Sequence, residues 1–313
     1  MAGVVTETRP TAKPGSARAA ARVRSRDGWW AAFFLAPQVV GLLVFLVLPL
    51  GFAVVLAFMK WDGLGEKSWV GFDNFAAQLS DPAFGTAVWN TVELAFLTVP
   101  FGLGLALLIA VALNHVRGKT LYRVVYFMPV VTSSVAVAVM WQIILAGGDY
   151  GVLNRTVQDW FGITPPDWLE DPNWVIVAIA VVTIWSSLGL NVVIFLAGLQ
   201  TIPPSLNEAA RIDGAGPIRV FRSVTLPMIS PTLFFSTVVA VISSFQAFDQ
   251  IYVLVDPDHN DGARTIVYQV YDLGFKRFEF GMSSAAALIL LALTLLVTLV
   301  QFGVQRRFVH YDS

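Results

Sequence analysis

The chain has 313 residues, of which 56% are hydrophobic and 13% are charged, and its 20 basic and 21 acidic residues leave a formal net charge of −1. A soluble domain carries charge on about a quarter of its residues, so this balance predicts an integral membrane protein. The near-zero net charge gives no field that would favour nucleic acid, and the absence of cysteine excludes a disulfide framework, an iron–sulfur cluster and cysteine-bound zinc.

The N-terminal segment differs from the rest of the chain. Residues 1–28 are rich in Ala, Arg, Gly and Pro and predict a disordered basic arm on the cytoplasmic side. The apolar run that follows, residues 29–59, is far longer than the h-region of about 7–15 residues in a signal peptide. We therefore interpret it as a retained first membrane span that opens a membrane domain over residues 29–313.

Five further apolar runs follow in chain order, at residues 88–113, 121–146, 174–199, 232–255 and 283–304. Each is long enough for the roughly 20 residues with which a helix crosses the hydrocarbon layer. None alternates in the manner of a barrel strand, and a lipid-exposed backbone must satisfy its own hydrogen bonds. The sequence predicts an all-α membrane protein with six transmembrane helices.

The orientation follows from the basic residues between these spans. Fourteen of the 20 Lys and Arg residues lie in the arm, the 114–123 link, the 200–231 link and the C-terminal tail. By the positive-inside rule these parts are cytoplasmic, so both termini are predicted to lie inside the cell membrane.

The link between the fourth and fifth spans predicts a compact helix-turn-helix. Ser205 and Glu208 have the spacing of a capping box, which predicts a short helix that Asp213-Gly214 ends. Pro217 suits the first turn of a second short helix, predicted to stop before Leu226-Pro227. The pattern alone leaves a linker and a docking surface as equal alternatives.

The residues of this link, over 205–231, resemble the EAA loop of binding-protein-dependent ABC importer permeases. The resemblance is carried by Glu208, Ala209, Ala210, Asp213, Gly214, Ala215, Phe221, Leu226 and Pro227. In that family the loop forms a coupling helix that docks in a cleft of the ATPase subunit. The resemblance therefore implies that these residues couple the chain to an ATPase.

The resemblance extends over residues 30–311 and points to the carbohydrate-uptake branch of the type I permeases, with a MetI-like fold, similar to maltose- and glycerol-3-phosphate-type permeases. It is carried by Trp69–Phe75, Asp81-Pro82, Asn90-Thr91, Phe245–Tyr252 and Thr265–Tyr268. It implies a second permease subunit in a heterodimer, an ABC ATPase dimer, an extracytoplasmic solute-binding protein and a sugar or sugar-like solute. A hexose, a disaccharide, a polyol and glycerol-3-phosphate all stay open.

ATP hydrolysis is expected in a partner. Gly118-Lys119-Thr120 is the nearest approach to a phosphate-binding loop, but the P-loop pattern needs a glycine at position 113, which is Leu. We expect neither an enzyme activity nor a cofactor in this chain.

Polar side chains inside the spans are candidates for the solute pathway, because they cost free energy in hydrocarbon unless they face a wet cavity or each other. The candidates in the fourth and fifth spans are Trp185, Ser187, Asn191, Ser243, Gln246 and Asp249. Thr183, Ser187 and Asn191 follow one face of the fourth span, and Ser243, Gln246 and Gln250 one face of the fifth. Hydrogen bonding between packed helices is the alternative.

Two other classes of protein remain as alternatives. An ion-gradient-driven secondary transporter or channel predicts internal repeats, broken helices or buried acids, and Asp249 is the one acid deep enough within a span. A membrane-embedded enzyme needs a catalytic constellation. The three histidines are scattered and no metal-ligand spacing occurs, so no metal site is predicted.

Overall fold

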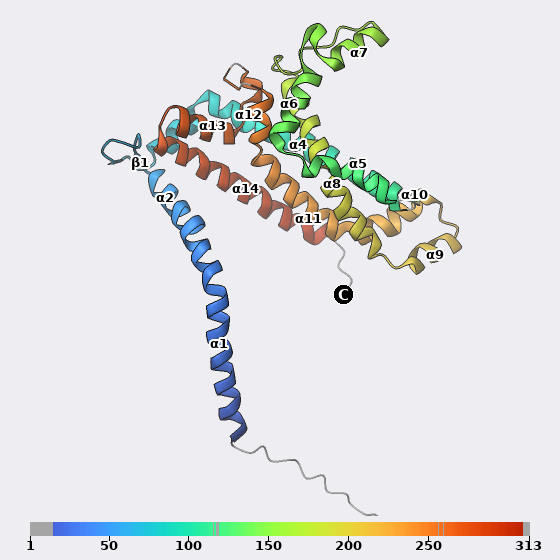
Figure 1. Ribbon diagram of the computed structural model, residues 1–313, viewed down its shortest axis with the longest axis horizontal. Helices are drawn as coiled ribbons and strands as arrows, with labels where there is room; N and C mark the ends of the chain where they lie inside the picture. Colours follow the sequence, from blue (N-terminus) through green and yellow to red (C-terminus); the bar gives the residue numbers. More distant parts are fainter. Residues whose placement is uncertain (1–14, 115, 117–118, 256, 259, 309–313) are drawn as a thin grey trace, which may run out of the picture. The chain divides into compact units, whose positions relative to one another are not determined.

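The computed structural model describes residues 15–114, 116, 119–255, 257–258 and 260–308, and helices account for most of them (Figure 1). The chain divides into two compact units, residues 1–55 and 56–313. The first unit contains α1 (Gly15–Leu42), the π-helical turn η1 (Leu43–Val47) and most of α2 (Leu48–Leu56). The backbone of residues 15–28 is thus helical where the sequence predicted a disordered arm, because Ala and Arg are strong helix formers. Residues 1–14 of that arm lie outside the described residues.

The second unit holds all other elements. Its first part contains β1 (Met59–Lys60), β2 (Ser68–Trp69), α3 (Asp73–Ser80), α4 (Pro82–Asn114), α5 (Lys119–Val131), α6 (Ser134–Leu145), η2 (Gly148–Tyr150) and α7 (Val152–Phe161). Its second part contains α8 (Val175–Gln200), α9 (Pro204–Ile212), α10 (Pro217–Val220), η3 (Phe221–Thr225), α11 (Leu226–Phe245), α12 (Asp249–Leu254), η4 (Asp261–Ala263), α13 (Ile266–Tyr271), η5 (Asp272–Lys276) and α14 (Phe280–Phe308). The two strands form an antiparallel hairpin in which Met59 pairs with Trp69.

Five helical segments of the described chain are long and apolar enough to cross a membrane. They are Trp29–Leu56, Pro82–Asn114, Val175–Gln200, Pro217–Phe245 and Phe280–Gln305. The first, second, fourth and sixth predicted spans correspond to four of them within a few residues. The multi-pass helical membrane fold is therefore confirmed.

The third and fifth predicted spans are not continuous helices. The third, residues 121–146, consists of α5 and α6 with a break at Thr132-Ser133, soon after Pro129. The fifth was predicted at 232–255, but its helix ends at Phe245, and α12 begins only at Asp249. A long apolar run fixes the length of chain available to cross the membrane, whereas polar residues and prolines within it allow the helix to break.

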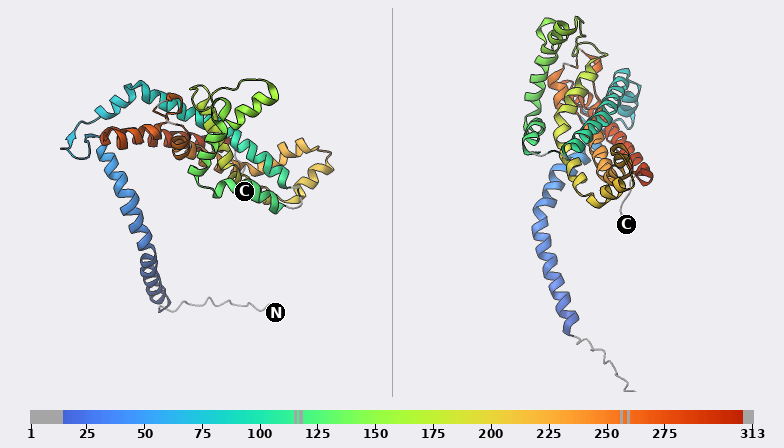
Figure 2. Two further views of the ribbon diagram at one scale, coloured as in Figure 1. Left: turned by 45° about the horizontal axis from the view of Figure 1, so that its top comes forward. Right: turned by 90° about the vertical axis from the view of Figure 1, so that its right-hand side faces the viewer.

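The long helices of the second unit lie side by side and leave a distinct group of short elements at each end. Figure 1 shows α9 and α10 at one end and α7, α12 and α13 at the other. The right-hand view of Figure 2 shows the same separation, with α7 in green at the top and α9 in olive at the bottom. The two ends correspond to the link after α8 and to the links before α8 and after α11.

The packing of α4 against α8 forms the centre of the unit. Gly102, Ala106 and Ala110 of α4 are buried at a spacing of four residues, and a Cβ atom at Gly102 would lie 3.4 Å from Ile184 of α8. Small residues let two helix backbones approach closely where lipid supplies no hydrophobic driving force. Buried Val192, Phe195 and Leu196 of α8 belong to the same apolar cluster.

A still closer approach joins α8 to α5, at Gly189. A Cβ atom here would meet the carbonyl oxygen of Tyr126 and would lie 2.9 Å from Cγ2 of Val130 and 3.1 Å from Cα of Phe127. We expect Gly189→Ala to push α5 away and to destabilise the fold by about 1–3 kcal/mol, the range for overpacking. A thermal unfolding curve in detergent measures this.

Gly104→Ala in α4 is the matched control, because nothing lies within 4 Å of a Cβ atom at that glycine. Alanine there is expected to leave stability unchanged or to raise it, since Gly is a poorer helix former by about 1 kcal/mol. Equal unfolding temperatures for the two variants would contradict the close packing of α5 on α8.

Candidate functional site

The short helix α9 forms for a different reason from the one predicted. It begins at Pro204, and its N-cap residue, Pro203, makes no side-chain hydrogen bond. The predicted capping box of Ser205 and Glu208 is therefore wrong, because Ser205 already lies inside the first turn. Proline suits this position, since its ring holds the helical φ angle and its missing N–H would have had no helical partner.

The end of α9 is built as predicted. Gly214 has a left-handed φ of +77°, and the N–H of Gly214 bonds to the carbonyl of Arg211 at 3.0 Å. The N–H of Ala215 bonds to the carbonyl of Ala210 at 2.9 Å. These two bonds form a Schellman motif, which satisfies the last carbonyls of the helix and needs a residue without a Cβ atom at its turn.

The second helix of the link does not stop before Leu226-Pro227, so that prediction is wrong. α10 passes through η3 into α11 without interruption, and the N–H of Leu226 bonds back to the carbonyl of Phe221. The wider π-helical turn lets the helix continue into Pro227, which has no N–H of its own. The link is thus joined to the long helix α11 as one continuous rod.

The surface of α9 and α10 combines exposed apolar and acidic side chains. Ile212 is 86% exposed and Ile218 is 71% exposed, and Glu208, Asp213 and Ala209 are also exposed. We name this surface, residues 204–220, the coupling knob. Large apolar side chains grouped on an exposed surface of this kind are typical of a protein contact site.

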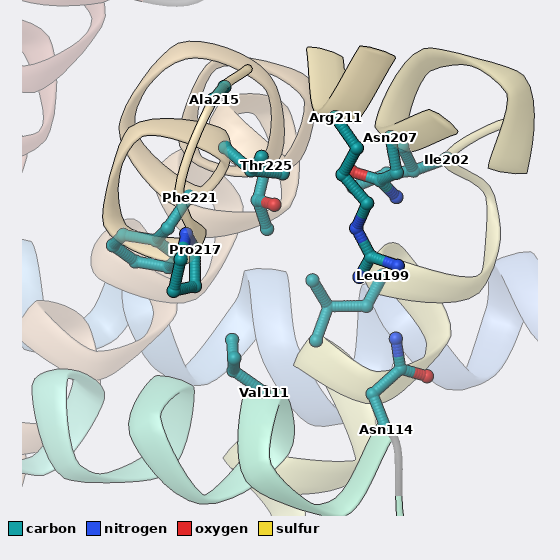
Figure 3. Close-up of a pocket in the computed structure, with 11 residues that line it drawn as sticks. Val111, Asn114, Leu199, Ile202, Asn207, Arg211, Ala215, Pro217, Phe221 and Thr225 are labelled. Carbon is teal, nitrogen blue, oxygen red and sulfur yellow. The ribbon is translucent and has the colours of Figure 1, made fainter. Parts of the chain in front are cut away.

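A cavity of about 580 Å³ lies beneath the coupling knob. Its walls come from the ends of α4 and α8, from α9 and from the α10–α11 rod (Figure 3). Arg211 and Asn207 of α9 line it opposite Ala215 and Phe221, and the Oδ1 atom of Asn207 has no hydrogen-bond partner among the described residues. Of the remaining predicted coupling residues, Ala210, Leu226 and Pro227 are half-buried, and Leu226 packs against the core.

A second, polar pocket lies beside Thr183 of α8 at the end of α11 that is remote from α10, where the two helix breaks meet. Its volume is about 280 Å³, and its lining residues are Ser134, Thr183, Ser243, Gln246, Ala247, Phe248, Asp249 and Gln250. We name it the polar pocket. Three of the predicted pathway residues, Ser243, Gln246 and Asp249, lie in it together.

The helix breaks explain how these residues meet. Gln246 and Phe248 leave helical geometry after Phe245, and Asp249 opens α12, where a carboxylate in the first turn is favourable. The prediction that Ser243, Gln246 and Gln250 share the face of one helix is therefore wrong. They line one pocket because the chain turns between them.

Hydrogen bonds fix one wall of the polar pocket. Gln250 accepts from Thr183 Oγ1 at 3.1 Å and donates to Ser186 Oγ at 2.9 Å, and Ser134 donates to Asp249 at 3.4 Å. The side chains of Ser243 and Gln246 are exposed and have no hydrogen-bond partner in the part of the chain that the structure describes. They are free to bind a solute.

The other predicted pathway residues lie outside the lining of the polar pocket. Ser187 donates to the carbonyl of Ile184, and Asn191 donates to the carbonyl of Ser187, both within α8. Trp185 packs edge-on against Trp141 of α6, with ring centroids 5.8 Å apart. Only Trp185 of these three thus contacts another helix, whereas Ser187 and Asn191 bond to the backbone of their own helix.

Several residues of these two sites were missed from the sequence. Ser134 and Phe248 line the polar pocket, and Asn207 and Arg211 line the cavity under the coupling knob. For Ser134 a signal existed, because Thr132-Ser133-Ser134 follows Pro129 and interrupts an apolar run. Phe248 lies in the segment Phe245–Tyr252 that carries the family resemblance, and Asn207 and Arg211 lie in the 205–231 link, but none of the three was singled out.

Comparisons with known proteins come from sequence and from structure. The model of the family described as "Binding-protein-dependent transport system inner membrane component" matches residues 99–310. The chain is 34% identical to the probable ABC transporter permease protein YesP of Bacillus subtilis (strain 168), covering 90% of this chain and 91% of that protein. It is 37% identical to the sn-glycerol-3-phosphate transport system permease protein UgpA of Brucella abortus, over 90% of this chain and 96% of that protein.

A further relative is the arabinooligosaccharides transport system permease protein AraP of Bacillus subtilis, 29% identical over 95% of this chain and 97% of that protein. Among solved structures, a chain of a bacterial ABC transporter involved in the import of the acidic polysaccharide alginate superposes with a TM-score of 0.81. The two chains are 26% identical, and the superposition covers 91% of the present chain and 98% of the transporter chain.

Proposed function

The chain belongs to the family of binding-protein-dependent transport system inner membrane components, and we propose that it forms half of the translocation pathway of an importer for neutral sugars. It is a permease subunit of an ABC transporter, a multi-pass membrane protein and a transport component with no enzymatic role of its own. The observation that carries the proposal is the placement of the coupling knob and the polar pocket at opposite ends of one helical rod, residues 217–245.

The coupling knob is the docking site for an ABC ATPase subunit in this proposal. Its exposed apolar side chains, Ile212 and Ile218, lie on either side of the rigid turn at Gly214. A cleft on the ATPase would bury them and would gain about 1.5–3 kcal/mol for each fully buried side chain. The positive-inside rule supports a cytoplasmic position for the coupling knob in this proposal, because the 200–231 link is one of the basic segments.

The solute class follows from the polar pocket and from the relatives. Asp249 is the one charged residue among its described lining residues, the rest being hydroxyl, amide and apolar groups. The described lining contains no Lys or Arg that could pair with a phosphate or a uronate group. We therefore favour a neutral sugar over an anionic solute. By their names the relatives transport glycerol-3-phosphate, arabinooligosaccharides and the acidic polysaccharide alginate. These names support a sugar or sugar-like compound, whereas the preference for a neutral one rests on the polar pocket alone.

The partners complete the pathway. Ser243 and Gln246 are exposed in this subunit, and a second permease subunit in a heterodimer would cover the polar pocket from the open side. A solute-binding protein would deliver the sugar from outside, and the alginate importer was solved with an alginate pentasaccharide-bound periplasmic protein. An ABC ATPase dimer would bind on the inside.

The mechanism uses the continuity of the rod. Closure of the two ATPases moves the coupling knob. The half-buried side chains of Phe221 and Leu226, which pack against the core, transmit that displacement to α11. The other end of α11 forms the wall of the polar pocket at Ser243. ATP binding can therefore shift the pocket between outward-facing and inward-facing states through differential docking of the knob in the two states.

Broken helices beside a polar pocket also occur in secondary transporters, and the breaks at residues 132–133 and 246–248 fit that alternative. Family membership and the coupling knob weigh against it, because an ion-gradient-driven carrier has no use for an ATPase docking surface.

Cysteine labelling tests the proposed orientation and the ATPase contact together, since the chain has no native cysteine. We expect Ile212→Cys on the coupling knob to react with an impermeant maleimide only from the cytoplasmic side and to be protected when the ATPase subunits are present. Tyr150→Cys, at a site that is 92% exposed at the other end, should react only from outside and without protection. Labelling of both residues from one side contradicts the topology, and an unprotected Ile212→Cys contradicts the docking site.

A further inference from the structure

A row of four aromatic side chains starts at the edge of the polar pocket. Phe248 stacks on Tyr252 with centroids 5.4 Å apart and contacts Tyr271 at 5.1 Å. Tyr271 in turn stacks on Phe275 at 5.6 Å, and Tyr252 meets Tyr271 edge-on at 5.3 Å. We name these residues the aromatic row. They come from α12, α13 and η5 and from the turn before α12, at the end of the unit opposite the coupling knob.

The aromatic row is held by a network behind it. Buried Tyr268 donates to Asp258 at 2.8 Å and accepts a hydrogen bond from Lys276 at 2.8 Å, and Lys276 forms an ion pair with Asp258. The bond from Lys276 lowers the pKa of Asp258, and burial raises the pKa of Tyr268 to about 12. At neutral pH the carboxylate is therefore ionised and the tyrosine protonated, and the three side chains join α13 and η5 to Asp258.

The row is open on its outer side. Tyr252 is 44% exposed and Phe275 is 68% exposed, and the hydroxyl of Tyr271 donates to that of Tyr252 at 3.4 Å. Its inner end, Phe248, is itself part of the polar pocket. The row thus connects an outer surface with the polar pocket through a continuous series of ring contacts.

We propose that the aromatic row is an entry site that binds the ring of a neutral saccharide before the saccharide reaches the polar pocket. The C–H groups on the face of a sugar ring pack against the negative face of an aromatic ring, and hydroxyl groups at the ring edge bond to tyrosine oxygens. The paired hydroxyls of Tyr252 and Tyr271 supply such partners beside the stacked faces. The inference rests on the proposed function, because it gives the polar pocket an approach from outside.

Continuity with the polar pocket favours a solute over lipid as the occupant. The segments 249–254 and 261–276, which carry three of the four rings, lie outside the five helical segments able to cross a membrane. Lysine and aspartate behind the rings neutralise each other, so the row presents no net charge that would select an anionic headgroup or an anionic sugar.

The test uses the complete transporter in lipid nanodiscs and saturation-transfer NMR with irradiation of the aromatic protons. The probes are maltose and arabinotriose, with sn-glycerol 3-phosphate as a ringless anionic comparison. We expect saturation to reach the sugar-ring protons in the wild type and to fall about threefold or more in Tyr252→Ala and in Phe275→Ala. Tyr252→Phe keeps the ring and should retain most of the signal, and Tyr150→Ala, at an exposed tyrosine outside the row, should retain all of it.

Three outcomes would overturn the inference. The first is that neither saccharide receives saturation in the wild type, and the second is that the alanine variants match Tyr150→Ala. The third is that Tyr252→Ala separates the two permease subunits, which would make the row a subunit interface. ATP hydrolysis stimulated by the binding protein is measured on the same samples. Hydrolysis depends on the coupling knob and on assembly, whereas the change in NMR signal between variants reports the aromatic row. Failure of the inference is therefore distinguishable from failure of the proposed function.

Discussion

Replacing Gly214 by valine is expected to leave a folded, membrane-inserted protein that no longer couples ATP hydrolysis to uptake. Gly214 has a φ of +77°, and nothing lies within 4 Å of a Cβ atom built there. The new side chain therefore meets no neighbour, and the cost is backbone strain of about 1–2 kcal/mol for the left-handed conformation. Relief of that strain breaks the Schellman bonds to Ala210 and Arg211 and turns α9 away from α10.

The measurements are the amount of ATPase that co-purifies with the variant and the ratio of solute imported to ATP hydrolysed. We expect at least one of them to fall about tenfold, since a loss of 1.4 kcal/mol in docking changes an equilibrium tenfold. Gly216→Val is the matched control, because Gly216 has an ordinary extended backbone with φ −71° and ψ 169° and also has open space around it. Wild-type values for both variants would refute the coupling role of residues 205–231.

Gln246→Ala is expected to weaken transport, while Asn191→Ala leaves it close to the wild-type value. Gln246 lines the polar pocket and has no hydrogen-bond partner among the described residues, so its amide is available to a hydroxylated solute. Asn191 already donates to the carbonyl of Ser187 in its own helix. Loss of one net hydrogen bond costs about 0.5–1.5 kcal/mol, which corresponds to a roughly two- to twelvefold higher solute concentration for half-maximal uptake.

Concentration-dependent uptake by the assembled transporter checks this difference, with co-purification of the partner subunits as the control for assembly. Equal effects of the two substitutions would show that lining the polar pocket does not distinguish residues that contact the solute from residues that do not. A stronger effect of Asn191→Ala would instead support the prediction that the face of α8 carrying Asn191 lines the solute pathway.

The end of α9 and the start of α10 were predictable because local chemistry determines them. A glycine after Asp213 and a proline at 217 specify a helix end and a helix start within four residues, and such signals act over a few residues of chain. The prediction failed where two local signals compete. Pro204 begins α9, so Ser205 lies inside the first turn and cannot cap the helix. The prediction failed again at Pro227, since a π-helical turn lets a proline follow within a continuous helix.

The polar pocket could be predicted only in part, because it assembles from α6, α8, α11, α12 and the turn before α12. Helical periodicity correctly grouped Ser243 with Gln246, but it also grouped Thr183 with Ser187 and Asn191, which have different surroundings in the structure. Position on a helix face does not say which partner helix covers that face. Averaged hydropathy in turn does not locate the break after Phe245, because Gln246, Asp249 and Gln250 lie within a run that becomes apolar again at Ile251.

The central claim is that ATP hydrolysis by a partner drives a sugar through a pathway half built by this chain. The most direct measurement is uptake of radiolabelled arabinotriose and maltose into proteoliposomes that contain the chain, its second permease subunit and the ATPase pair, with solute-binding protein on the outside. We predict uptake that requires ATP at the ATPase side, stops with a hydrolysis-deficient ATPase and is unchanged when ionophores collapse all ion gradients. Uptake by this chain in the absence of ATP, driven by a sodium or proton gradient, would contradict the account.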